Sequence, residues 1–219
     1  MTDLYPTVKY EITKSLGRDD PYPDESEWLI EINAQIFIYL EFEGVIQVGR
    51  CRFYYVDADE ALERSHCGPW RLLDIDSATE YFRVIYNDDT CCFTSEVEEV
   101  LDESFISNNL FVIDRVEVIS EYRGNGLARM AIEDAISLFA RRAEVIALKA
   151  YPLQFEAGRH INDDIDKEWS EKVGLNDLTT DQELAQQKII GLYTSMGFRA
   201  VGSGGILVRS RYDQRDYEE

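Results

Sequence analysis

The sequence predicts an α/β fold of the α+β type, in which a β-sheet is flanked by helices. Residues 28–43 and 45–56 alternate apolar with polar or aromatic side chains, the period of two that is typical of strands. Residues 110–119 show the same alternation and, after two glycines, are followed by helical spacing over 127–142. Paired strands, and a strand that leads into a helix, are the units of a sheet with helices packed against it.

The amino-terminal strands are expected to form an antiparallel hairpin, because Glu43 and Gly44 supply a turn between them. Residues 1–26 precede this hairpin and contain Pro6, Gly17, Pro21 and Pro23. Such residues are typical of irregular structure, so this segment is interpreted as a lead-in with one short strand over residues 10–12.

The strand over residues 110–119 is expected to be regular, so that alternate side chains share a face. One face would then carry Leu110, Val112, Asp114, Val116 and Val118. The other would carry Phe111, Ile113, Arg115, Glu117 and Ile119.

Two polar stretches, at about 57–107 and 154–182, are interpreted as insertions between the regular elements. In the first insertion we expect helices over 77–86 and 94–101. Thr94 is placed to cap the second of these helices, whose early glutamates would favour the positive end of the helix dipole.

The remainder of the chain predicts a strand over 145–150, a helix over 182–196, and two closing strands over 198–201 and 206–210. No internal repeat and no linker divides the sequence. We therefore expect a single domain over residues 1–219 that contains the two insertions.

A net charge of −21 is the strongest feature of the composition. It disfavours direct binding to nucleic acid or to an anionic membrane, because like charges repel. It would favour an amine-bearing small molecule or a basic protein as substrate, although solubility alone also accounts for such a charge. The sequence gives no indication of the oligomeric state.

The sequence also bears on cellular location and on the state of the cysteines. No apolar run approaches the ~18 residues of a spanning helix, and residues 1–4 lack the pattern of a signal peptide. A cytoplasmic protein is therefore expected. The four cysteines form no Cys-x-x-Cys pair and are accompanied by two histidines, so we expect reduced thiols and no metal site. They are Cys51, Cys67, Cys91 and Cys92.

Most of the recognisable chemistry lies where the strand over 110–119 ends, two glycines follow and a long helix begins. Glycine lets the backbone turn sharply and approach a ligand closely. The first N–H groups of a helix lack intrahelical partners, and the helix dipole adds partial positive charge, so this turn suits a pyrophosphate. The residues concerned are Arg123, Gly124, Asn125, Gly126, Leu127, Ala128 and Arg129.

Taken alone, Gly-x-Gly at such a position is also ordinary turn chemistry. It is not a dinucleotide fingerprint, because Arg129 stands where Gly-x-Gly-x-x-Gly has its third glycine. It is not a P-loop either, because no Gly-Lys-Ser/Thr follows.

Two blocks of the sequence resemble the GNAT superfamily of N-acetyltransferases. The pattern Arg/Gln-x-x-Gly-x-Gly/Ala of that superfamily is met by Arg123, Gly126 and Ala128. Downstream, residues 192–198 read Leu-Tyr-Thr-Ser-Met-Gly-Phe and resemble the family block Leu-Tyr-x-x-x-Gly-Phe. The two blocks occur in the family's order with a strand between them.

This resemblance covers about residues 110–150 and 183–210, and implies a mixed, mostly antiparallel sheet that splays between its fourth and fifth strands. The pantetheine arm of acetyl-CoA, the co-substrate, would lie in that splay and bond the backbone of Val116 and Val118. The pyrophosphate would bind the glycine turn. Gln186 stands where the family has an asparagine that contacts the cofactor, and it keeps the amide chemistry.

The resemblance also assigns chemistry to side chains. Tyr193 matches the tyrosine that protonates the departing thiolate in many relatives, and Glu117 is the candidate base that takes the proton of the amine. Lys149 stands where some relatives place a glutamate, which removes one standard base. Tyr151 and the histidines remain alternatives, whereas Asp114 is better suited to binding a cationic substrate.

These observations predict an acetyl-CoA-dependent N-acetyltransferase that acts by direct transfer on a primary amine of a cationic substrate. Two other functions remain open. One is a catalytically weak acyl-CoA-binding regulatory module, which the Lys149 and Gln186 departures favour. The other is an acidic interaction protein that mimics nucleic acid, which the net charge favours.

Overall fold

The computed structural model describes residues 5–15, 25–42, 44–65, 72, 84–156 and 164–213. Its strands are β1 (Pro6–Thr13), β2 (Leu29–Leu40), β3 (Gly44–Val56), β4 (Leu110–Val118), β5 (Val145–Lys149), β6 (Arg199–Val201) and β7 (Ile206–Ser210). Its α-helices are α1 (Ala58–Ser65), α3 (Ser95–Leu101), α4 (Leu127–Phe139), α5 (Asp164–Val173) and α6 (Gln182–Thr194).

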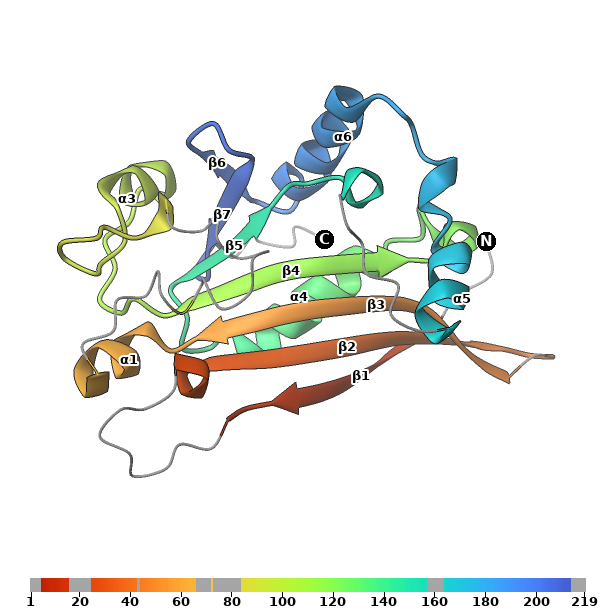
Figure 1. The fold of residues 1–219 in the computed structure, drawn as a ribbon, viewed down its shortest axis with the longest axis horizontal. Helices are drawn as coiled ribbons and strands as arrows, with labels where there is room; N and C mark the ends of the chain where they lie inside the picture. The colour runs from red at the N-terminus through yellow and green to blue at the C-terminus, as the bar shows by residue number, and fades with distance from the viewer. Residues whose placement is uncertain are drawn as a thin grey trace.

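The strands form one mixed sheet in the order β1-β2-β3-β4-β5-β7-β6 (Figure 1). All neighbouring strands are antiparallel except β4 and β5, which are parallel and are joined through α4. The predicted α+β fold with a mixed, mostly antiparallel sheet and flanking helices is therefore confirmed.

The predicted hairpin is confirmed, because β2 and β3 pair from Leu29↔Val56 to Leu40↔Gly44. The lead-in is more regular than predicted. All eight residues of β1 pair with β2, and Val8 and Tyr10 pack against the core. The alternation that directs these two side chains inward is short, and the neighbouring proline and glycine obscured it.

The predicted face assignment along β4 is wrong, because the strand contains a bulge. Arg52 of β3 pairs with Arg115, but the next residue, Phe53, pairs with Ile113, so Asp114 is the extra residue. An extra residue reverses the alternation beyond it. Leu110 and Val112 consequently pack in one core cluster, whereas Val116 and Val118 pack in the other with Phe111 and Ile113.

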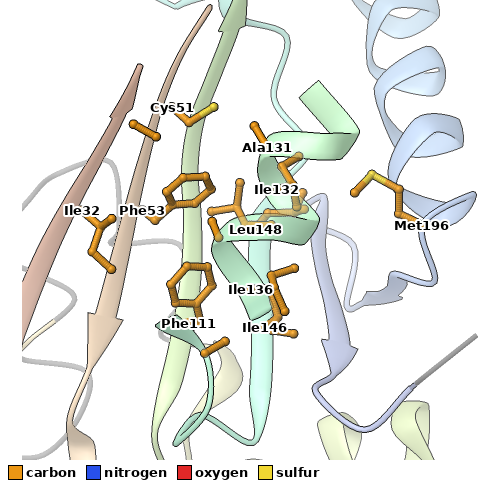
Figure 2. Close-up of a cluster of buried hydrophobic side chains, with 14 of the residues drawn as sticks. Ile32, Cys51, Phe53, Phe111, Ala131, Ile132, Ile136, Ile146, Leu148 and Met196 are labelled. Carbon is orange, nitrogen blue, oxygen red and sulfur yellow. The ribbon is translucent and has the colours of Figure 1, made fainter. Parts of the chain in front are cut away.

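The two core clusters lie on opposite faces of the sheet. Figure 2 shows the cluster under α4, where Phe53 and Phe111 stack with ring centroids 5.6 Å apart and Ile132 and Ile136 of the helix face them. The other cluster is covered by α1 and α3, whose Val97 is fully buried. Figure 1 shows α3 and α5 near opposite ends of the sheet.

The helices α3 and α6 begin close to the predicted positions, but the contacts at their first residues differ from the prediction. α3 begins after Thr94 as predicted, but the Thr94 hydroxyl donates to the carbonyl of Val84 and does not cap the helix. The helix expected over 77–86 lies mostly outside the described residues, and residues 84–86 form a 3-10 turn and an isolated bridge. α6 begins at a cap that was not predicted, where Asp181 accepts from the N–H of Leu184 at 3.0 Å.

Candidate functional site

The parallel strands β4 and β5 pair only along the first half of β4. Their pairing runs from Leu110↔Val145 to Ile113↔Leu148, and β5 ends at Lys149. The bulge at Asp114 lies where the pairing stops. Among the described residues, no strand pairs with β4 on this side from residue 114 to residue 118, so an edge of the backbone is left open inside the sheet.

The pairing of β4 with β3 determines which backbone groups face the open edge. The N–H of Ile119 donates to the carbonyl of Val48, so odd-numbered residues at this end of β4 direct their backbone groups toward β3. Val116 and Val118 therefore direct their N–H and C=O groups toward the open edge. The Val118 carbonyl is used there, because it accepts from the Arg123 Nε at 3.1 Å.

The glycine turn follows immediately after this edge. Gly124 and Gly126 have φ of 80° and 77°, in the left-handed region, where a side chain would cost ~1–2 kcal/mol. A Cβ built on either glycine would meet no atom within 4 Å. The glycines are thus required by the shape of the turn, and both backbone positions are open to approach from outside.

The helix that begins at Leu127 presents N–H groups that bond to none of the described residues. The first N–H group that bonds back to the turn is that of Met130, which donates to the Gly126 carbonyl at 3.0 Å. Among the described residues, the N–H groups from Gly124 to Arg129 donate to no other group of the chain. These donors and the helix dipole favour an anion at the turn.

The two arginines of the turn are held by carbonyl groups. The Arg123 guanidinium bridges the carbonyls of Val118 in β4 and Val173 at the end of α5. The Arg129 guanidinium donates to the carbonyl of Ser195 at 2.7 Å, just after α6. Both side chains therefore tie the turn to neighbouring elements and add positive charge beside it.

Tyr193 comes from α6 and lies on the α4 face of the sheet. Its ring packs edge-on against Phe198, with centroids 5.7 Å apart, and it interacts electrostatically with Cys51, which pairs with Val116 across β3 and β4. Burial raises the pKa of Tyr193, and Cys51 raises it further. No described residue hydrogen-bonds to the hydroxyl, and the raised pKa favours the neutral phenol form of Tyr193.

Glu117 lies on the opposite face, because Val116 and Val118 on either side of it pack under α4. Its side chain is 6% exposed. Arg115 donates to one carboxylate oxygen at 3.4 Å, and the indole N–H of Trp169 donates to the other at 2.7 Å. The carboxylate is therefore buried, paired and adjacent to the open edge.

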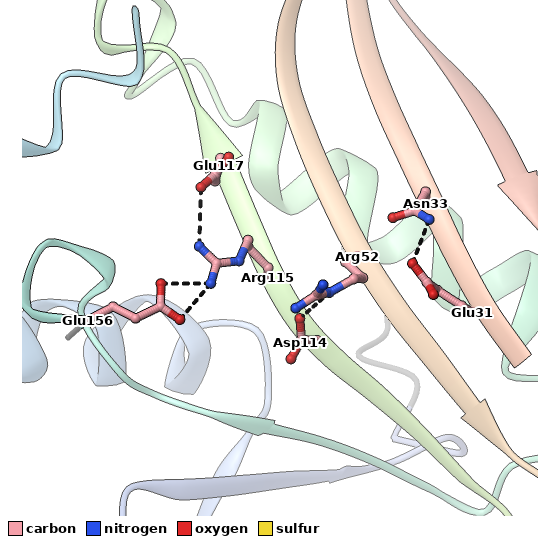
Figure 3. Close-up of polar contacts among 7 residues, drawn as sticks. All are labelled: Glu31, Asn33, Arg52, Asp114, Arg115, Glu117 and Glu156. Carbon is pink, nitrogen blue, oxygen red and sulfur yellow. Dashed lines mark hydrogen bonds and ion pairs between the residues drawn. The ribbon is translucent and has the colours of Figure 1, made fainter. Parts of the chain in front are cut away.

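Figure 3 shows that Glu117 belongs to a wider group of charged side chains on this face. One guanidinium nitrogen of Arg115, Nη2, also donates to both carboxylate oxygens of Glu156, at 2.6 and 2.7 Å. Arg52 pairs with Asp114 at 2.6 Å. Asp114, considered above as a group for a cationic substrate, is thus engaged within the chain.

The remaining candidates surround the carboxyl end of β5. The Lys149 ammonium lies 5.5 Å from the ring centroid of Tyr151, whose hydroxyl donates to the Phe155 carbonyl at 2.7 Å. The Gln186 amide nitrogen lies 3.0 Å from a Cβ built on Gly205, in the turn between β6 and β7. Gln186 therefore lies near the end of β5, and it is distant in sequence from the glycine turn.

Three residues that contribute to this site were not identified from the sequence. Trp169 and Glu156 both bind the Glu117–Arg115 pair, and the Arg50 guanidinium lies 4.2 Å from the Trp169 ring centroid. The available signal was Trp169 itself, a large aromatic residue in a mostly polar insertion. Such a residue requires burial, but the sequence does not say against which surface.

No protein family model matches this chain, and neither a curated protein nor a solved structure matches it. Within the described ranges, no helix has the length and apolar character needed to cross a membrane. Over the same ranges, no group of three or more histidine, cysteine, aspartate or glutamate side chains is arranged to hold a metal ion.

Proposed function

We propose that the chain is an acetyl-CoA-dependent N-acetyltransferase that acts by direct transfer on a primary amine. The observation that carries this proposal is the open backbone edge of β4, which leads directly into a glycine turn whose N–H groups bond to none of the described residues. An extended amide-containing arm that ends in a pyrophosphate matches such a surface. Acetyl-CoA has both parts, in that order.

In this proposal the pantetheine amides bond the Val116 backbone and the N–H of Val118, in the manner of an added strand. The pyrophosphate lies at the N–H groups of Gly124 to Arg129, where the dipole of α4 stabilises its charge. The acetyl thioester then reaches the sheet at Val116, between Tyr193 on one face and Glu117 on the other.

The reaction needs one base and one acid. The amine nitrogen attacks the acetyl carbonyl carbon, the new C–N bond forms, and the C–S bond breaks. Glu117 accepts the proton that the amine loses, directly or through water, and Tyr193 donates a proton to the departing thiolate. A neutral phenol is the form that this step requires, and burial favours that form of Tyr193.

The acceptor is proposed to be an amine-bearing small molecule or a basic protein. The net charge of −21 supports this choice, because it raises the local concentration of cations around the molecule. The charged side chains nearest Glu117 are paired with one another, so long-range attraction is expected to matter more than a dedicated acidic pocket.

The test is the release of CoA from acetyl-CoA with a panel of amines, in the wild type and in Tyr193→Phe. We expect the substitution to lower kcat by about 10²–10⁴-fold while the affinity for acetyl-CoA is unchanged, because only the proton donor is lost. Tyr39→Phe is the matched control, since this tyrosine is 63% exposed on the β2–β3 hairpin. An unchanged kcat in Tyr193→Phe would remove the acid assignment.

A second candidate function, acyl-CoA binding without efficient turnover, is favoured by one observation. Lys149 occupies the end of β5 and lies against Tyr151. No carboxylate stands at that position to act as a base. Acetyl-CoA binding with no CoA release from any amine would favour this candidate over the enzyme.

A further inference from the structure

Trp169 has the contacts of a residue that supports Glu117. It lies in α5, in the second insertion, and is 7% exposed. Its indole N–H donates to Glu117 at 2.7 Å in a buried hydrogen bond, and its ring lies against the Arg50 guanidinium. These two contacts restrain both the ring and the N–H of Trp169.

We propose that Trp169 is a positioning residue that holds the Glu117 carboxylate at the open edge of β4. This inference rests on the proposed function, in which Glu117 is the base. Arg115 and Trp169 bind different oxygens of the carboxylate, so together they fix its plane as well as its place.

The position of Trp169 is fixed in turn by the end of α5. Val173, one helical turn later, is fully buried, and its carbonyl accepts from Arg123 of the glycine turn. Gly174 follows with φ of 60° and lies against Ser120, since a Cβ there would be 3.4 Å from the serine Cβ. α5 is thus attached both to the turn proposed to bind the pyrophosphate and to the side chain proposed to act as base.

In this arrangement α5, in the second insertion, contacts both Glu117 and the glycine turn. The two parts of the site that lie on the core sheet, the turn and Glu117, are connected through an element outside it. A base displaced by about 1 Å can lose about 10²-fold in rate, so the contact with Trp169 is expected to appear in kcat.

The first experiment is Trp169→Phe, which keeps an aromatic ring against Arg50 and removes the N–H donor. We expect kcat to fall by about 10- to 100-fold, with the affinity for acetyl-CoA unchanged within about twofold. Trp28→Phe is the matched control, because Trp28 is 2% exposed in the core cluster under α1 and α3. It is expected to alter stability without altering kcat.

A double-mutant cycle with Glu117→Ala separates positioning from packing. If Trp169 acts through Glu117, Trp169→Phe changes the residual kcat by less than about twofold when Glu117 is already alanine. A Trp169→Phe effect of the same size in both backgrounds would overturn the proposal, and so would an unchanged kcat in the single variant.

A measurement without substrate keeps this inference distinct from the proposed function. Hydrogen exchange of the Trp169 indole N–H, followed by NMR in the cofactor-free protein, is expected to be slow and to accelerate at least about tenfold in Glu117→Ala. Equal exchange in both proteins would show that the contact is not formed and would overturn the positioning role. Failure of acetyl-CoA to bind while the exchange difference stands would instead overturn the proposed enzyme, and with it Glu117 as a base to be positioned.

Discussion

Three residues around Val116 show how single side chains acquire their properties here from the faces they occupy. Tyr193 and Cys51 lie under the α4 face, where burial keeps both groups neutral and raises the pKa of each. Glu117 lies on the other face, where Arg115 and Trp169 compensate for its burial. The phenol proposed as the acid and the carboxylate proposed as the base thus lie on opposite faces of the sheet.

The burial of Cys51 predicts that its thiol is unreactive. Burial, and secondarily the charge of Glu117, raises the pKa of Cys51 to about 12, and the side chain is 4% exposed. At pH 8 we expect iodoacetamide to modify the exposed Cys92 and to leave Cys51 unmodified, as measured by peptide mass spectrometry, because only an accessible thiolate reacts. Equal modification of both in the folded protein would contradict this placement.

The same shift has a consequence for stability. The thiol ionises near pH 8.5 in the unfolded chain but only near pH 12 when folded. Its contribution to the free energy of unfolding is therefore complete below about pH 8.5 and is lost as the pH rises toward 12.

Among the elements, the turn between β4 and α4 was predictable, because glycines at a strand end mark it in the sequence alone. The hairpin and the two closing strands were predictable for a similar reason, since their alternation is local. The bulge at Asp114 was not, because a bulge is a mismatch between two strands and appears only when β3 is beside β4. The packing of α5 on Glu117 is also a contact between distant segments, for which no local pattern exists.

The glycine turn allows a matched pair of substitutions. Gly126→Ala and Gly202→Ala both place a Cβ at a positive φ, 77° and 62°, with no atom within 4 Å, so both should cost ~1–2 kcal/mol of stability. Only Gly126→Ala should weaken acetyl-CoA binding, by about tenfold or more, because its Cβ would lie where the pyrophosphate is proposed to approach the backbone. Calorimetric titration of both variants measures this, and equal affinities would argue against the turn as the site.

A second prediction concerns the junction of α4, α6 and β7. Arg209 of β7 makes two bonds to Glu133 of α4, at 2.7 and 2.9 Å, and one to the Met196 carbonyl after α6. The arginine is 7% exposed, so Glu133→Gln should lower the free energy of unfolding by about 1–3 kcal/mol in urea.

The control for this junction is Lys172→Gln, which breaks the exposed pair between Lys172 and Glu168 on α5. It should leave the free energy of unfolding unchanged within error, because solvent screens exposed pairs. Equal destabilisation by the two substitutions would show that the Arg209–Glu133 pair contributes no more than a surface pair.

For the whole molecule, the dominant quantity is the net charge of −21. Self-repulsion at this charge opposes compactness. Raising the NaCl concentration from 0.01 to 0.1 M shortens the screening length from about 30 to about 10 Å, so we expect the midpoint of thermal unfolding to rise. A midpoint that falls with added salt, measured by scanning calorimetry, would mean that attractive pairs outweigh repulsion.

The proposed function requires that the open edge of β4 and the turn that follows it bind acetyl-CoA. The most direct measurement is a calorimetric titration of the wild-type protein with acetyl-CoA. We predict saturable binding of one molecule per chain. Undetectable binding at millimolar acetyl-CoA would contradict it, and would leave the acidic surface as the remaining guide to function.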